Sequence, residues 1–134
     1  MFADTSGWCA LLDSSDQNHP GAAKLWREIS GATAKIYTSD YVLDETITLI
    51  RRKIGHGPAV QFIRSIMASR IVEILRVTEA AWQDAWQMFE KQRDKDYSFT
   101  DCTSFVLMKQ NGLSRSFAFD RHFTQAGFLL IPGE

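Results

Sequence analysis

Four acidic residues lie where short apolar stretches end or where helices are predicted to begin. Asp4 follows Phe2-Ala3, and Asp120 follows Phe117-Ala118-Phe119. Asp101 and Glu45 fall within the first one or two turns of predicted helices. Carboxylates that gather in one place repel one another and raise one another's pKa unless a cation is present. Since Mg²⁺ and similar hard ions prefer oxygen ligands, four carboxylates that meet would predict a hydrolytic metal site.

Each of these acids alone also has an ordinary structural interpretation. Asp4 and Asp120 are suited to cap the helices that follow them. Ser98 and Asp101 have the spacing of a capping box, although glutamate is more usual at the second position. Glu45 is typical of a solvated helix residue, and helical phase separates it by about 100° from its neighbour Asp44. The functional interpretation therefore depends on all four side chains sharing one site.

The elements that would position these acids alternate between strands and helices. Apolar runs predict strands over 1–5, 35–39, 70–77, 114–119 and 128–131. Periodic apolar positions and capping residues predict helices over 8–12, 20–30, 40–54, 58–69, 78–92, 98–111 and 121–126. In the helix over 40–54 the apolar stripe is Leu43, Ile47, Ile50 and Ile54, and in the helix over 78–92 the inward residues are Ala81, Ala85, Met88 and Phe89.

This order predicts an α/β fold with a central parallel sheet of about five short strands, flanked by helices on both faces. Ligands of such sheets lie beyond the carboxyl ends of the strands. All four acids fall at strand-to-helix transitions, so we expect them at that one edge of the sheet.

The composition is that of a folded domain. The chain has 134 residues, of which 45% are hydrophobic and 23% are charged, and we expect a single domain over 1–134. The net charge of -1 gives no global sign of nucleic-acid binding, so any phosphate-binding surface must be local. Cys9 and Cys102 lack a metal-binding spacing and are expected to be buried, reduced thiols. The sequence shows no signal peptide or membrane span, and a cytoplasmic location is expected.

Four segments resemble the acidic motifs of PIN-domain nucleases. The segments are Phe2-Ala3-Asp4-Thr5-Ser6-Gly7-Trp8, Val42-Leu43-Asp44-Glu45-Thr46, Ser98-Phe99-Thr100-Asp101-Cys102-Thr103-Ser104-Phe105 and Phe119-Asp120-Arg121-His122-Phe123. Their order and spacing match over nearly the whole chain, and the first and third motifs together are the most specific. The compact size resembles the VapC-type toxins of toxin–antitoxin pairs.

The resemblance implies a metal-dependent endoribonuclease, in which clustered carboxylates hold one or two Mg²⁺ or Mn²⁺ ions that activate water. It assigns metal-binding and catalytic roles to Asp4, Glu45, Asp101 and Asp120. It also implies an RNA substrate, a cognate antitoxin that covers the acidic pocket, and a homodimer. The aliphatic residues of the two helices over 40–54 and 58–69 are candidates for the dimer interface.

Residues beside the motifs are candidates for supporting roles. Hydroxyl groups would orient the acids through hydrogen bonds, and the candidates are Thr5 and Ser6 at Asp4, and Ser98 and Thr100 at Asp101. Local positive charge could contact RNA, with Arg51, Arg52, Arg115 and Arg121 as candidates. No histidine pattern indicates a metal site, and His122 is notable only for its place beside Asp120. Asp96 is interpreted as a loop residue, Trp8 as a packing residue, and Trp82 and Trp86 as core or interface residues.

Other classes of protein remain to be weighed. A haloacid-dehalogenase-type phosphotransferase also begins with an aspartate after its first strand, but it needs a second aspartate where this chain has Ser6. A receiver domain needs a lysine after a late strand, which the sequence lacks. Two alternatives within the PIN family stay open, namely an RNA-processing nuclease without an antitoxin and a catalytically silent binding module.

Overall fold

The computed structural model describes residues 1–32 and 34–133, which contain a five-stranded sheet of order β3-β2-β1-β4-β5. All neighbouring strands are parallel, which confirms the predicted α/β class. The strands are β1 (Phe2–Ala3), β2 (Ile36–Ser39), β3 (Val72–Leu75), β4 (Arg115–Phe117) and β5 (Leu129–Ile131). The helices are α1 (Thr5–Leu12), α2 (His19–Ser30), α3 (Asp40–Lys53), α4 (His56–Ala68), α5 (Glu79–Lys91), α6 (Phe99–Gln110) and α7 (His122–Gln125).

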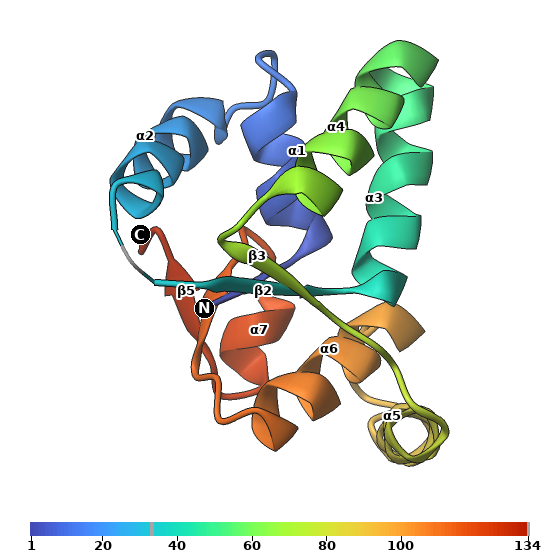
Figure 1. Cartoon of the computed structure of the whole chain (residues 1–134). Helices are drawn as coiled ribbons and strands as arrows, with labels where there is room; N and C mark the ends of the chain where they lie inside the picture. Colours follow the sequence, from blue (N-terminus) through green and yellow to red (C-terminus); the bar gives the residue numbers. More distant parts are fainter. Residues whose placement is uncertain (33, 134) are drawn as a thin grey trace.

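The helices form one layer on each side of the sheet. Helices α1 to α4 cover one face, and α5, α6 and α7 lie on the other (Figure 1). The chain builds the sheet outward from β1 through β2 to β3, then crosses over to add β4 and β5 on the other side of β1. The strand order therefore changes direction between β1 and β4. In open parallel sheets, a crevice forms at that point beyond the carboxyl ends of the strands.

Trp8 anchors the core between α1 and the sheet. Its side chain is 1% exposed, and its ring makes edge-on contacts with Trp26, Phe62 and Phe117 at centroid distances of 5.6, 5.4 and 6.2 Å. The indole N–H donates a hydrogen bond to the Thr38 hydroxyl at 3.1 Å, so its polar atom is satisfied inside the core. The prediction that Trp8 packs, rather than stacking on a base, is confirmed.

The structure corrects the boundary of the first strand, and it exposes two side chains that were predicted to lie on buried helix faces. Thr5 begins α1 instead of ending the first strand, and the helix starts three residues before the predicted Trp8, because the Asp4 carboxylate accepts the Ser6 N–H and caps it. Phe89 was expected to face inward but is 41% exposed, because α5 turns its alanine face to α6 and leaves Phe89 at the edge. Ile54 follows the last residue of α3 and is 40% exposed.

Gly7 sets the close approach between α1 and β4. A Cβ atom at this position would lie 2.3 Å from the Phe117 carbonyl oxygen, and backbone atoms cannot move aside cheaply. We expect Gly7→Ala to destabilise the protein by about 2 to 4 kcal/mol, measured by urea denaturation. Gly57→Ala is the matched control, since Gly57 is also helical and its added Cβ would meet nothing within 4 Å. Equal stabilities of the two variants would contradict this packing account.

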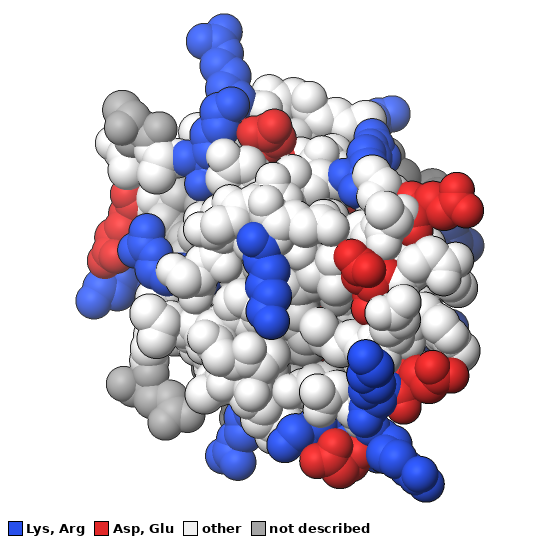
Figure 2. All heavy atoms as spheres, turned by 90° about the horizontal axis from the view of Figure 1, so that it is seen from below, with Lys and Arg blue, Asp and Glu red and all other residues white. Residues whose placement is uncertain are grey.

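The surface shows no dominant charge on the side of α5 to α7. On this face, basic and acidic side chains are interspersed among uncharged ones, and a basic side chain lies near the middle (Figure 2). This mixture agrees with the net charge of -1. Among the described helices, none combines the length and apolar character that crossing a membrane requires.

Candidate active site

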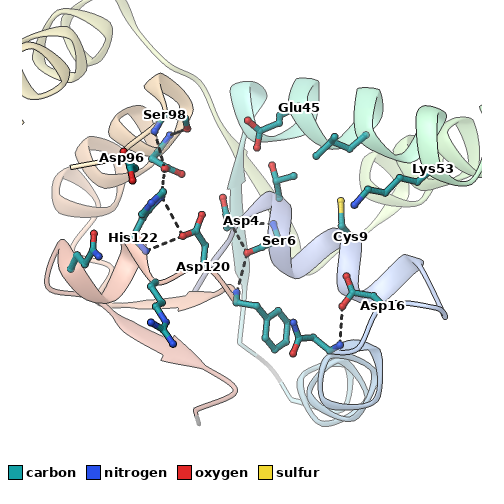
Figure 3. A pocket seen from close by; sticks show the side chains of 17 residues that line it. Asp4, Ser6, Cys9, Asp16, Glu45, Lys53, Asp96, Ser98, Asp120 and His122 are labelled. Carbon is teal, nitrogen blue, oxygen red and sulfur yellow. Dashed lines mark hydrogen bonds and ion pairs between the residues drawn. The ribbon is translucent and has the colours of Figure 1, made fainter. Parts of the chain in front are cut away.

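A pocket of about 840 Å³ opens at the carboxyl ends of the central strands, where the strand order changes direction. Side chains from the residue after β1, from α1, α3 and the start of α6, and from the segment after β4 line it (Figure 3). All four acids singled out in the sequence line this pocket, together with two further acids. The six are Asp4, Asp16, Glu45, Asp96, Asp101 and Asp120.

Asp4 lies at the inner end of the pocket, directly after β1. Its Oδ2 accepts the Ser6 backbone N–H at 3.1 Å and the Ser6 hydroxyl at 2.8 Å. The Ser6 oxygen in turn accepts the backbone N–H of Phe119 at 3.0 Å, which ties Asp4 to the segment that carries Asp120. Burial raises the pKa of Asp4 to about 7, and the Asp101 charge adds to this rise while the Ser6 hydrogen bonds oppose it. Asp4 therefore caps α1, and its environment disfavours the ionised form of its carboxyl group.

Asp101 is fixed by the start of α6. Its Oδ2 accepts the Ser98 N–H at 3.0 Å, while the Ser98 hydroxyl accepts the Asp101 N–H at 3.0 Å. This reciprocal capping box orients the carboxylate toward the pocket. Burial raises the pKa of Asp101, the charge of Asp120 adds to the rise, and hydrogen bonds from Ser98 and His122 oppose it. The same side chain therefore caps α6 and lines the pocket.

His122 joins Asp101 to Asp120. Its Nδ1 lies 2.8 Å from Asp101 Oδ2 and 3.3 Å from Asp120 Oδ1, and its backbone N–H donates to Asp120 Oδ1 at 2.9 Å. Ligand atoms of the three residues all lie within 4.8 Å of one another, close enough to share a metal ion. The sequence gave no histidine a metal-binding spacing, and the proximity of His122 to the two acids makes it a further candidate ligand.

Glu45 reaches the pocket from α3. It lines the cavity, whereas its neighbour Asp44 is exposed on the helix surface, as helical phase predicts. Burial raises the pKa of Glu45. The charges of Asp101 and Asp120 across the pocket act in the same direction, because they repel the ionised Glu45 carboxylate. A hydrogen bond with Thr5 lowers this pKa. The Thr5 hydroxyl also lies 3.4 Å from the Val42 carbonyl and accepts the Thr46 hydroxyl at 3.2 Å, so it links α1 to α3.

Only some of the residues predicted to support the acids or to bind RNA lie at the pocket. The Thr100 carbonyl accepts the Thr103 hydroxyl at 2.7 Å, and Thr100 is not among the described residues that line the pocket. Arg121 does line it. Arg51 lies in a separate groove between α3 and α4, and Arg52 is exposed near the end of α3. Arg115 begins β4 at the opposite edge of the sheet and does not line the pocket; burial, and then the Arg115 charge, lower the pKa of the Met1 amine there.

The sequence did not indicate Asp16 or Cys9 as part of the site, and Asp96, near the third motif, was interpreted as a loop residue rather than a ligand. Lys53 extends from the end of α3 toward Cys9 at one side of the pocket (Figure 3). Two α-helical turns separate Lys53 from Glu45, so both side chains can reach the pocket from the same side of α3. Cys9 and Cys102 are free thiols as expected, but Cys9 is only partly buried because it lines the pocket.

Comparison with known proteins gives a consistent result over the whole chain. The sequence model of the PIN domain matches residues 1–129. The chain is 37% identical over 134 residues to a Mycobacterium tuberculosis protein named 23S rRNA-specific endonuclease VapC20, covering 100% of this chain and 99% of that protein. It is 24% identical over 123 residues to a protein of Archaeoglobus fulgidus named VapC ribonuclease, covering 90% of this chain and 77% of that protein.

Solved structures agree with this result. The crystal structure of M. tuberculosis VapC20, described as a toxin that cleaves the sarcin–ricin loop, has a TM-score of 0.87 at 37% identity and covers 96% of this chain and 95% of its own. The structure of FitAcB from Neisseria gonorrhoeae has a TM-score of 0.67 at 14% identity and covers 96% of this chain and 94% of its own. At that identity, the second match shows a shared fold alone.

Proposed function

The chain belongs to the PIN-domain family, and on that premise we propose that it is a divalent-metal-dependent endoribonuclease that cleaves RNA in its acidic pocket. The observation that carries this proposal is the convergence of Asp4, Glu45, Asp101 and Asp120, from four separate segments, on one cavity. The similarity to named VapC ribonucleases over the whole chain supports the same activity. The presence of all four acids favours an active enzyme over a silent binding module.

The donor set fits a hard divalent cation. Three of the four acids have a raised pKa, mainly because they are buried and in part because of one another's charges, and a bound cation would favour their ionised forms. Asp101, Asp120 and His122 are close enough to share one ion, with Asp4 and Glu45 on the same cavity wall. Carboxylate-rich sites suit Mg²⁺ and Mn²⁺, and we propose one or two of these ions as the cofactor.

When bound, such an ion supplies an activated water and stabilises charge on the reacting phosphate. The protein's own residues then have distinct tasks. Ser6 and the capping box of α6 hold the Asp4 and Asp101 carboxylates in fixed directions. Arg121 and Lys53, at the pocket wall, are placed to bind phosphate oxygens of the RNA on either side of the cleaved bond.

His122 is proposed as a positioning residue for this ion. Because its imidazole contacts both Asp101 and Asp120, His122→Gln should lower cleavage by about 10- to 100-fold through weaker ion binding. Cleavage rates measured over a range of Mn²⁺ concentrations test this, since excess ion should restore part of the activity. An unchanged rate, or a loss that no Mn²⁺ concentration relieves, would argue against this role.

We further propose a ribosomal substrate and two protein partners. The 37% identity to the 23S rRNA-specific endonuclease supports 23S rRNA as the target. A cognate antitoxin is proposed because an acidic pocket would attract a basic segment of a neutralising partner. A homodimer is proposed through the groove between α3 and α4, where Met67 is 69% exposed beside Ile47 and Ile63. A cytoplasmic location is proposed on the same ground as the ribosomal target.

The activity is tested by incubating the purified protein with ribosomal RNA in Mg²⁺ or Mn²⁺, and in parallel with an excess of chelator. We expect discrete cleavage products only when the ion is present. Asp120→Asn should abolish them, whereas Arg115→Ala should not, since Arg115 lies at the opposite edge of the sheet. Cleavage that persists in chelator would contradict the proposed chemistry, and binding without cleavage would favour the silent module.

A further inference from the structure

Exposed aromatic side chains of α5 form a second surface on the molecule. Trp82, Trp86 and Phe89 are 36%, 43% and 41% exposed, although burying such rings is strongly favourable. The Trp86 ring lies nearly parallel to Trp82, at a centroid distance of 6.2 Å and 13°, and to Phe89, at 6.0 Å and 25°. Phe99 of α6 supports the row from below, with centroids 5.2 Å from Trp82 and 6.2 Å from Phe89. The rings are therefore held in place by neighbours rather than free to collapse.

This row leads into a cleft of about 580 Å³ beside the acidic pocket. Asp96 lines both cavities, so the cleft and the acidic pocket are adjacent. We call it the aromatic cleft. The lining residues that matter here are Trp86, Phe89, Arg93, Lys95, Asp96 and Tyr97.

We propose that the aromatic cleft binds an unpaired base of the RNA next to the cleaved phosphodiester, with the base stacked on Trp86. This inference rests on the proposed ribonuclease function. Flat aromatic faces stack on any nucleobase, and cations beside them bind the phosphates on each side of it. Arg93 and Lys95 supply that charge in the wall of the cleft, where they alternate with the acidic Glu90 and Asp96.

The charges of the cleft favour RNA over a second protein chain as its occupant. The cores of protein interfaces are depleted of charged residues. The aromatic cleft instead has Glu90, Arg93, Lys95 and Asp96 in its wall, around the Trp86 ring. An RNA strand that passes from this cleft to the acidic pocket would keep its phosphates near the two cations and its base on the ring.

The test compares Trp86→Leu with Trp86→Phe in an Asp101→Asn background, which prevents cleavage. Leucine keeps apolar bulk and phenylalanine keeps an aromatic face, so the pair separates stacking from general packing. The probe is the ribosomal RNA fragment that the wild-type protein cleaves. We expect leucine to weaken binding by about tenfold and phenylalanine by about threefold or less, measured by filter binding.

A second measurement places the base. A set of RNA fragments is prepared, each with one abasic nucleotide at a different position near the cleavage site. One of them should bind the protein that keeps Trp86 more weakly than the intact fragment does. The Trp86→Leu variant should bind that abasic fragment and the intact fragment equally well. The inference is overturned if leucine binds like wild type, if no abasic position matters, or if Trp86→Leu converts a dimer to a monomer in light scattering. If the wild type cleaves no RNA, the proposed function itself has failed and this inference falls with it.

Discussion

Asp101→Asn is expected to lower the rate of RNA cleavage by about a thousandfold or more, because it removes a negative ligand at the centre of the acidic pocket. Asparagine has nearly the same shape and keeps an oxygen that can accept the Ser98 N–H, so the capping box and the fold should survive. The measurement is a single-turnover cleavage rate on ribosomal RNA, accompanied by a thermal melt.

Asp44→Asn is the matched control for this change. Asp44 also lies early in its helix, directly beside Glu45, but its side chain is exposed on the helix surface. The same loss of one charge at Asp44 should leave cleavage within about threefold of wild type, since exposed charges act weakly across solvent. If Asp101→Asn retains activity, or if both variants lose it equally, the site as described is wrong.

Asp4→Asn should change how the stability of the metal-free protein depends on pH. The pKa of Asp4 is raised from 3.8 to about 7 in the folded protein, mainly by burial. Between these values the folded state holds a proton that the unfolded state releases, so this group makes the wild type lose stability as the pH rises through that range. Asparagine is always neutral, so the variant lacks this contribution of residue 4 to the pH dependence of stability.

We therefore expect Asp4→Asn to be more stable than wild type at pH 8 by about 2 to 4 kcal/mol, and nearly equal to it at pH 4. Urea denaturation in chelator at both pH values measures the difference. Adding Mg²⁺ at pH 8 should stabilise the wild type more than the variant, because the ion binds an ionised Asp4. A difference between the two proteins that does not vary with pH would refute the buried, proton-binding state of Asp4.

The fold could be predicted from local signals because those signals agree with one another. Ser39, Thr78 and Ser98 each accept a backbone N–H at the start of a helix, at or next to the predicted helix starts at 40, 78 and 98. Strands joined through helices had to be parallel, and this rule brought Asp4 and Asp120 to the same edge. The convergence of the four acids was thus predictable from topology, although their roles stay proposals.

The rest of the pocket depends on the paths of loops, which no local pattern determines. His122 reaches Asp101 because α7 is a single turn that points back toward α6, and its length and direction follow from packing of Phe123 and Phe128 on Phe105. Asp16 and Asp96 lie in loops with no periodicity. The exposure of Phe89 was missed because periodicity predicts the buried side of a helix but not the width of the surface that covers it.

The most direct test of the central claim is a titration of the protein with Mn²⁺, in which electron paramagnetic resonance measures the free ion. The account predicts saturable binding of one or two ions by the wild type at pH 8, and loss of that binding in a variant with Asp4, Asp101 and Asp120 all replaced by asparagine. Equal Mn²⁺ binding by the two proteins, with the fold intact in both, would contradict the claim that these carboxylates gather to hold a metal ion.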